Sequence, residues 1–150
     1  MSDPLRIATI GYEGSTLDAV VRALQKAGVD TLVDVRAVAR SRKPGFAKTR
    51  LGAGLEDGGI AYVHLRGLGT PAEGRAAAKA GDTDTMRRIF VEHLATPEAQ
   101  ADLRHLAERV EAGETVALLC YEAAPHECHR RLVADALAQM LPLQVDDLAP

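Results

Sequence analysis

Four side chains suited to catalysis lie within one short stretch near the C-terminal end of the sequence. Cys120 and Glu122 follow an apolar run, and Cys128 and His129 come after the proline-containing turn that succeeds it. A thiolate is a nucleophile, and a carboxylate or an imidazole transfers protons. Arg130 comes next and can neutralise an anion. We therefore expect a site here, with Cys120, Glu122, Cys128 and His129 as its catalytic residues.

The two cysteines allow three interpretations. In the first, either thiol is a nucleophile whose pKa is lowered by a helix start and by neighbouring basic side chains. In the second, Cys120 and Cys128 bind zinc with His126 or His129, and with His64 as a further ligand, although the short paired spacings typical of zinc sites are absent. In the third, both cysteines are small buried apolar side chains.

Several familiar sites are missing from the sequence. The loop of phosphatases and sulfurtransferases, in which arginine follows cysteine by six residues, is absent because His126 occupies that position after Cys120. The segment GYEGS at residues 11–15 lacks the Gly-Lys-Ser/Thr end of a P-loop and the GxGxxG glycines of a dinucleotide fold. No motif requires a cofactor, and we assign no metal ligand.

The overall charge conceals a basic segment. The net charge is −3, yet residues 36–50 contain six basic residues and no acidic one. Such a segment attracts phosphate or nucleic acid, although a solvated loop and helix face would show the same pattern. An anionic small molecule or a nucleic acid is therefore the expected partner.

The first residues resemble neither a secretory signal nor a membrane span. Asp3 and Pro4 precede a short apolar run that stops at Gly11. Both signals need a longer apolar stretch. We therefore expect a cytoplasmic protein with no membrane partner, in which the two cysteines are thiols rather than a structural disulfide.

Short apolar runs alternate with segments of helical periodicity. Strands are expected over residues 5–10, 31–35, 60–65 and 116–120, with a short edge strand at 143–145. Helices are expected from a Ser15 cap to Gly28 and over residues 47–56, 83–94, 97–112 and 128–140, whereas 67–80 is expected to be a mobile loop or a short irregular helix. This order predicts one α/β domain over residues 1–150. It has three layers, with a mainly parallel sheet of four to five strands and helices on both faces.

The predicted sheet also predicts where a ligand binds. In parallel sheets ligands gather at the carboxyl ends of the strands, and each polar cluster of this chain directly follows a strand. We expect these clusters to share one pocket, with substrate-binding residues Tyr12, Ser15, Asp34, Arg36, Ser41, Lys43, His64 and Arg130. The helix start at Ser15 can hold an anion through free amides, whereas Asp34 and Arg36 can instead form a local pair that fixes the loop.

Six motifs together resemble one known family. They are GYEGS at 11–15, DVR at 34–36, SRKPGF at 41–46, YVHLRGLG at 62–69, LLCYE at 118–122 and CHR at 128–130. This set resembles the family called domain of unknown function 488, over nearly the whole chain. The resemblance implies a compact α/β domain with its active site at these motifs, and no established reaction. Arg40-Ser41 stands where Pro-Ser is common in the family, so the approach to Ser41 is expected to differ.

The combined observations favour an intracellular enzyme whose reaction class stays open. Its substrate would carry phosphate, as a nucleotide or a nucleic-acid fragment does. Arg36, Lys43 and Arg130 would neutralise this substrate, Glu122 or His129 would transfer protons, and one cysteine would attack or shape the pocket. One alternative is a non-catalytic module that binds nucleic acid or a nucleotide through residues 36–50. Another is a redox sensor in which the two cysteines form a reversible disulfide.

Overall fold

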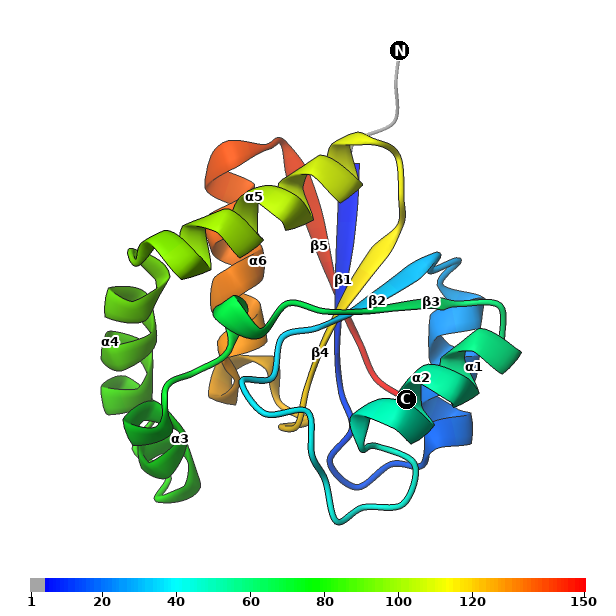
Figure 1. Ribbon diagram of the computed structural model, residues 1–150, viewed down its shortest axis with the longest axis horizontal. Coiled ribbons are helices and arrows are strands. Elements are labelled where there is room, and N and C mark those ends of the chain that lie inside the picture. The colour runs from blue at the N-terminus through cyan, green and yellow to red at the C-terminus, as the bar shows by residue number, and fades with distance from the viewer. Residues whose placement is uncertain (1–4) are drawn as a thin grey trace.

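Five parallel strands form the centre of the protein, and helices cover both sides of this sheet (Figure 1). The computed structural model describes residues 5–150. The strand order is β3-β2-β4-β1-β5, and every neighbouring pair is parallel. The strands are β1 (Leu5–Gly11), β2 (Thr31–Asp34), β3 (Ala61–His64), β4 (Val116–Cys120) and β5 (Leu143–Leu148). The predicted three-layer α/β/α fold is confirmed.

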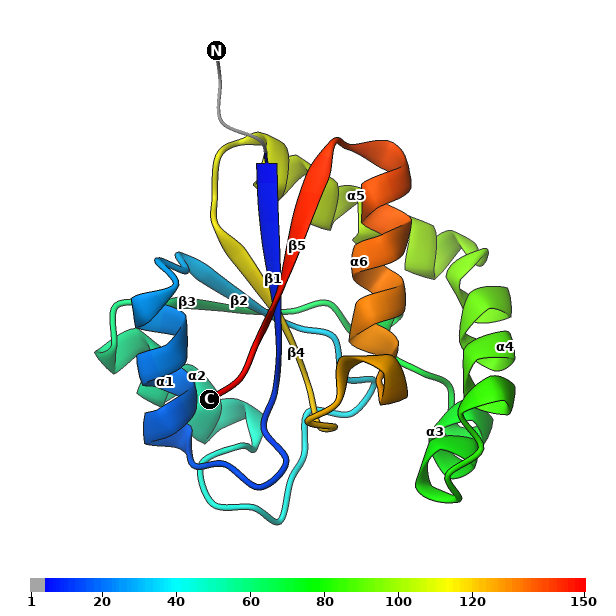
Figure 2. The same cartoon turned by 180° about the vertical axis from the view of Figure 1, so that it is seen from behind.

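The helices divide into two layers, which the two opposite views show on either side of the sheet (Figures 1 and 2). Helices α1 (Leu17–Lys26) and α2 (Lys48–Asp57) cover one face. Helices α4 (Thr83–Leu94), α5 (Pro97–Glu111) and α6 (His129–Met140) cover the other. Helix α3 (Ala72–Lys79) packs against α4, and two short 3-10 helices lie at Arg66–Leu68 and Pro125–Glu127.

The side chains of the central strand β4 point alternately to the two faces of the sheet. All five residues of β4 are buried. Ala117 and Leu119 belong to the core under α1 and α2, whereas Val116, Leu118 and Cys120 belong to the core under α4, α5 and α6. Because side chains alternate between the faces of a strand, Cys120 must point toward the layer that contains α6.

Three local expectations need correction. Thr16, not Ser15, caps α1, because its hydroxyl accepts from the backbone N–H of Ala19 at 3.1 Å. Residues 67–80 contain the regular helix α3, which lacks apolar periodicity because its buried contact is made by Gly74 against Thr70 and Ile89. Strand β5 extends to Leu148, three residues beyond the expected end.

The sheet brings the carboxyl ends of its strands to one edge. Strand β4 ends at Cys120 between Gly11 of β1 and Asp34 of β2. The loops after these three strands therefore meet beside the start of α6. Within residues 5–150, no helix is both long enough and apolar enough to cross a bilayer.

Candidate functional site

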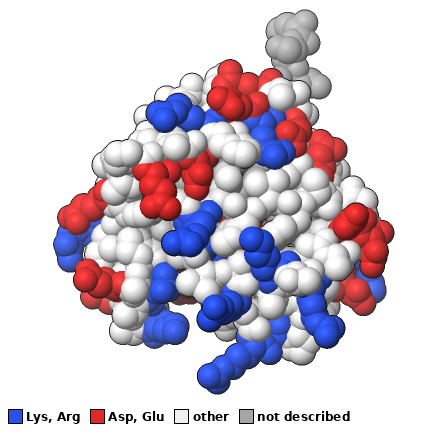
Figure 3. Space-filling view, in the orientation of Figure 1, with Lys and Arg blue, Asp and Glu red and all other residues white. Residues whose placement is uncertain are grey.

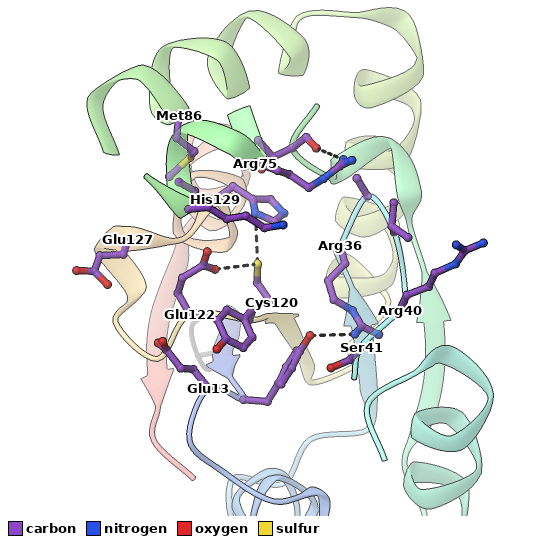
Figure 4. A pocket seen from close by; sticks show the side chains of 17 residues that line it. Glu13, Arg36, Arg40, Ser41, Arg75, Met86, Cys120, Glu122, Glu127 and His129 are labelled. Atoms are coloured by element: carbon purple, nitrogen blue, oxygen red, sulfur yellow. Dashed lines mark hydrogen bonds between the residues drawn. The ribbon is translucent and has the colours of Figure 1, made fainter. Parts of the chain in front are cut away.

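A cavity of about 640 Å³ opens at this edge of the sheet, and Cys120 and His129 lie in its wall (Figure 4). We call it the main cavity. It lies among the loops that follow β1, β2 and β4, with α3 and α4 on its remaining side. Its ionisable and hydroxyl-bearing side chains are Tyr12, Glu13, Arg36, Arg40, Ser41, Thr70, Arg75, Lys79, Cys120, Tyr121, Glu122, Glu127 and His129.

Cys120 and His129 form a hydrogen-bonded pair whose imidazole tautomer is fixed by the backbone. The Cys120 Sγ lies 3.4 Å from His129 Nδ1, and His129 Nε2 lies 2.6 Å from the carbonyl oxygen of Val35. A carbonyl only accepts, so Nε2 must carry a proton and the Nδ1 of the neutral ring is free to accept one from the thiol. Phe90 packs beside the imidazole, with ring centroids 5.2 Å apart. The arrangement places a thiol beside an imidazole that can accept its proton, and a backbone carbonyl fixes the orientation of that imidazole.

A carboxylate lies on another side of the same thiol. Cys120 Sγ donates to Glu122 Oε2 at 3.5 Å, and Glu122 also lines the main cavity. The thiol proton therefore has two acceptors, an imidazole and a carboxylate. Either group can exchange a proton with a molecule bound above the sulfur.

The second cysteine has a different environment. Cys128 Sγ lies 3.8 Å from His129 Nδ1, but Cys128 does not line the main cavity and is only 2% exposed. Burial, together with hydrogen bonding to Cys120, raises the pKa of the Cys128 thiol well above its ordinary value. The position of the two thiols therefore favours Cys120 as the reactive one. Both cysteines are free thiols, as expected.

Burial and hydrogen bonding have opposite effects on His129. Burial of the ring disfavours its charged form, but hydrogen bonds to Cys128 and to the Val35 carbonyl outweigh burial and raise the pKa of His129.

Arg130 has a supporting position rather than the expected contact with substrate. Its side chain is fully buried and does not line the main cavity. The guanidinium donates to the carbonyl oxygens of Glu122 and Ala123, so it fixes the loop that follows Cys120. Gly11 allows this loop to pass, because a Cβ at that position would lie 1.8 Å from the Glu122 carbonyl oxygen.

Asp34 and Arg36 bind each other. The sequence allowed two roles for them, substrate binding or a local pair that fixes the loop, and the structure contains the pair. Arg36 Nε and Nη2 donate to the two carboxylate oxygens of Asp34 at 2.8 and 2.7 Å, and both side chains are buried. Arg36 Nη1 also donates to the Tyr12 hydroxyl and to the Phe46 carbonyl. Burial opposes the charge of Arg36, but Asp34 raises its pKa. Arg36 therefore reaches the main cavity with its charge already neutralised.

Opposite charges lie on opposite sides of the main cavity. Figure 4 shows Glu13, Glu122 and Glu127 on one side of Cys120, and Arg36, Arg40 and Arg75 on the other. Of the cations in the wall, Arg40, Arg75 and Lys79 are exposed, and among residues 5–150 none of the three forms an ion pair. We call these three residues the basic rim. Their uncompensated charge suits an anionic ligand.

The expected site residues are only partly brought together. Those that line the main cavity are Tyr12, Arg36, Ser41, Cys120, Glu122 and His129. His64 lies in the wall of a neighbouring cavity, where its Nε2 is 2.7 Å from the Arg36 carbonyl oxygen. Ser15, Asp34, Lys43, Cys128 and Arg130 line neither cavity. The Ser15 helix start and Lys43 therefore lie outside the walls of both cavities.

Sequence reasoning missed the cations supplied by the segment between β3 and α4. Arg75 and Lys79 of α3 lie at the main cavity, and Arg40 comes from the loop after β2. Arg40 belongs to the basic segment singled out in the sequence, so its charge was a usable signal. The Ala- and Gly-rich segment that contains Arg75 gives no such signal, because only the packing of α3 against α4 brings it to the site.

The side chains that could bind zinc lie close together. The ligand atoms of Cys120, Cys128 and His129 all lie within 4.8 Å of one another. Tetrahedral zinc, with bonds of about 2.3 Å to sulfur and 2.0–2.1 Å to nitrogen, separates a sulfur and a nitrogen ligand by about 3.5 Å. The observed separations from His129 Nδ1, 3.4 and 3.8 Å, are close to that value. His126 and His64 are not members of this group.

Comparison with known proteins identifies a family but no characterised relative. The family described as domain of unknown function DUF488 matches residues 16–137, which is most of the chain. Neither the curated proteins nor the solved structures contain a match. The match includes Arg36, Cys120, Glu122 and His129 of the cavity wall. The chain therefore belongs to the family described as domain of unknown function DUF488.

Proposed function

We propose that this protein is an enzyme that uses Cys120 as a nucleophile on a phosphate-bearing substrate, such as a nucleotide or a nucleic-acid fragment. One observation carries the proposal. Cys120 Sγ lies 3.4 Å from His129 Nδ1, while the other ring nitrogen donates to the Val35 carbonyl, and both side chains line a cavity large enough for a small-molecule ligand.

The geometry supports a two-step reaction. His129 Nδ1 takes the proton of the Cys120 thiol, and the thiolate forms a bond from Sγ to an electrophilic atom of the substrate. The leaving group departs with its bonding electron pair and takes this proton from His129, which becomes neutral again. Water then gives a proton to His129 and attacks the enzyme-bound group, and the bond to Sγ breaks. The departing thiolate takes that proton from His129, so the thiol is restored.

The charge distribution favours an anionic substrate. Arg40, Arg75 and Lys79 of the basic rim have no ion-pair partner within the described part of the chain, so a phosphate that reaches them does not have to displace a carboxylate. The carboxylates on the opposite side would repel the same phosphate. The ligand is therefore expected to bind with its phosphate toward Arg75 and its reacting group above Cys120.

Substitution at the two thiols tests this proposal. Turnover is assayed over a panel of nucleotides and phosphoesters, and bound intermediates are detected by intact-protein mass. Cys120→Ser is expected to lose at least about 10³-fold in kcat, because the alkoxide needed for attack is far less accessible than a thiolate. Cys128→Ser serves as the matched control and is expected to retain turnover. If Cys120→Ser keeps every ligand-dependent effect while Arg40→Gln/Arg75→Gln abolishes it, the protein is a binding module and not an enzyme.

Zinc bound by Cys120, Cys128 and His129 is the second candidate, supported by the convergence of their ligand atoms. When bound, zinc would supply an activated water or polarise a substrate oxygen. The Val35 carbonyl would accept a hydrogen bond from His129 Nε2 and so keep Nδ1 directed toward the metal.

Cys128 separates the two candidates. A zinc site requires Cys128 as a thiolate ligand, so Cys128→Ser would lower both metal content and turnover. The nucleophile mechanism needs only Cys120. Metal analysis of protein purified without chelators, performed on the wild type and on Cys128→Ser, therefore distinguishes them, since a stoichiometric metal that is lost in the variant would favour zinc.

A further inference from the structure

A second cavity adjoins the main cavity across residues 37–40. Its volume is about 710 Å³, and its wall contains Arg40, Lys48, His64, Arg66 and Arg75 but no carboxylate. Arg40, Arg75 and the backbone of residues 37–38 belong to the walls of both cavities. The two cavities therefore share a boundary formed by two arginines.

The cations of this second cavity have no acidic partners within the described residues, whereas some other surface arginines do. Arg88, Arg109 and Arg131 each form an ion pair with a nearby carboxylate. Lys48 and Arg66 are exposed, and within residues 5–150 neither forms one. Figure 3 shows Lys and Arg gathered over the lower part of this face, with Asp and Glu mainly above and at the sides. The uncompensated cations thus lie around both cavities, with uncharged surface between them (Figure 3).

The charges in the wall of the main cavity favour one path for a chain of phosphates that leaves it. Its carboxylates, Glu13, Glu122 and Glu127, lie on the side of Cys120 away from Arg40 (Figure 4). A chain of phosphates that leaves the main cavity is repelled on that side and attracted past Arg40 and Arg75. The attractive path leads into the second cavity, toward Lys48 and Arg66.

Exposed apolar side chains at the entrance of the main cavity favour a nucleic acid with unpaired bases as the polyanion. Val38 and Tyr121 are 45% and 46% exposed, although both line the main cavity. Unpaired bases stack on aromatic side chains in proteins that bind single strands, and Tyr121 is the exposed aromatic residue in this wall. Cys120 itself is only 6% exposed, so a base paired within a duplex would have to leave the stack to reach it.

We propose that the second cavity binds the backbone phosphates of a single-stranded nucleic acid whose reacting nucleotide occupies the main cavity. This inference rests on the proposed function for its reacting nucleotide, and it narrows the substrate class from phosphate-bearing molecules to single strands. Lys48 and Arg66 contact the phosphates beyond the reacting nucleotide. Arg40 and Arg75 contact the phosphate at the boundary.

Binding of a labelled oligonucleotide tests the inference directly. The probe is a fluorescein-labelled strand of about ten deoxythymidines, and its anisotropy is measured over a range of salt concentrations. Lys48→Gln/Arg66→Gln is expected to bind about tenfold more weakly, with a salt slope smaller by about 1.4, because each lost contact to a single strand removes about 0.7. Lys26→Gln/Arg104→Gln is the matched control, since both residues are exposed and line neither cavity. It is expected to bind as the wild type does.

Two further measurements separate this inference from the proposed function. Thymidine monophosphate fits the main cavity alone, so Lys48→Gln/Arg66→Gln is expected to bind it with wild-type affinity. Cys120→Ser is expected to bind the oligonucleotide with wild-type affinity whether or not the thiol is a nucleophile. A thermal melt of each variant verifies that it is folded.

Three results would overturn the inference. They are equal oligonucleotide binding by Lys48→Gln/Arg66→Gln and the wild type, an equal loss in the Lys26→Gln/Arg104→Gln control, and equal or tighter binding of a duplex of the same length. Turnover that survives in Cys120→Ser would refute the nucleophile and leave the phosphate path intact.

Discussion

At the scale of single residues, two thiols near the same nitrogen of one imidazole differ in access. Cys120 lines the main cavity, whereas Cys128 does not and is 2% exposed. The pKa of Cys128 is raised, first by burial and then by its hydrogen bond to Cys120. Since only a thiolate attacks an alkylating reagent, the raised pKa of Cys128 disfavours its modification, and the position of Cys120 in the cavity wall favours modification there.

Iodoacetamide is therefore expected to modify Cys120 at least about tenfold faster than Cys128 in the native protein. Peptide mapping by mass spectrometry after timed labelling gives the two rates. The difference is expected to vanish in denaturant, where both thiols are exposed. Equal native rates, or faster labelling of Cys128, would contradict the assignment of Cys120 as the accessible thiol.

Gly11 provides a second test at this scale. A Cβ at position 11 would lie 1.8 Å from the Glu122 carbonyl oxygen and 3.0 Å from Arg130 Nη1. Gly11→Ala must displace the loop that follows Cys120, and we expect a loss of about 1–3 kcal/mol in the free energy of unfolding, as for other overpacked positions. Urea denaturation measures the change.

Gly52 is the matched control for this substitution. It lies within α2, and a Cβ there would meet only the Tyr62 ring, at 3.6 Å or more. Gly52→Ala is expected to stabilise the protein by about 0.5–1 kcal/mol, because alanine has the higher helix propensity. A Gly11→Ala variant as stable as the wild type would show that the Glu122 loop is not held where the structure places it.

At the scale of elements, β2 and β3 are joined by side chains as well as by their backbone ladder. Tyr62 of β3 donates its hydroxyl to Asp34 Oδ2 at 2.6 Å, beside the two hydrogen bonds from Arg36. Burial, and then the hydrogen bond to Asp34, raises the pKa of Tyr62. This bond therefore helps to hold the carboxylate that orients Arg36 at the main cavity.

Tyr62→Phe is expected to lower the free energy of unfolding by about 1.5–3 kcal/mol near neutral pH, the usual contribution of a hydrogen bond to a charged group. Because the pKa is raised in the folded state, the contribution of the hydroxyl is complete below the unfolded value, about 10, and is lost as pH rises through the folded value. The stability difference between wild type and variant should therefore shrink only in the alkaline range. Urea titrations at several pH values measure it, and a difference that instead shrinks below neutral pH would refute the sign.

The start of α6 positions the side chains that lie around Cys120. His129 is the first residue of α6, and its ring reaches across to the Val35 carbonyl at the end of β2. Arg130, one residue later, holds the carbonyls of Glu122 and Ala123. One helical turn therefore fixes the base and the loop on either side of Cys120, which explains why these groups follow one another so closely in the sequence.

At the scale of the whole molecule, the basic rim is assembled from two distant segments. Arg40 follows β2, whereas Arg75 lies in α3 beyond β3. Neither residue alone makes a site, but together they line the shared boundary of the two cavities. A ligand that bridges them binds the folded protein only and so raises its apparent stability.

Thymidine monophosphate at about 100 times its Kd should stabilise the wild type by about 2.7 kcal/mol and raise Tm accordingly. Arg40→Gln/Arg75→Gln is expected to lose most of this shift at the same ligand concentration, whereas Lys26→Gln/Arg104→Gln should keep it. Thermal shift measures all three proteins. A shift of the same size in Arg40→Gln/Arg75→Gln would show that the phosphate binds elsewhere.

The sequence by itself determined the elements of the fold, and it predicted a cluster of reactive side chains at the end of β4. Apolar periodicity and strand-helix alternation depend on local order, so they predicted the parallel sheet, and the spacing of Cys120, Glu122 and His129 predicted a site at the end of β4. Only the tertiary structure decided which charged side chains are unpaired and reach the cavity. It buried Arg130 under the Glu122 loop, paired Arg36 with Asp34, and brought Arg75 to the cavity on a helix that sequence periodicity had missed. These outcomes depend on contacts between segments far apart in the chain, and the charge of an arginine in a sequence does not show whether a carboxylate in the folded protein already neutralises it.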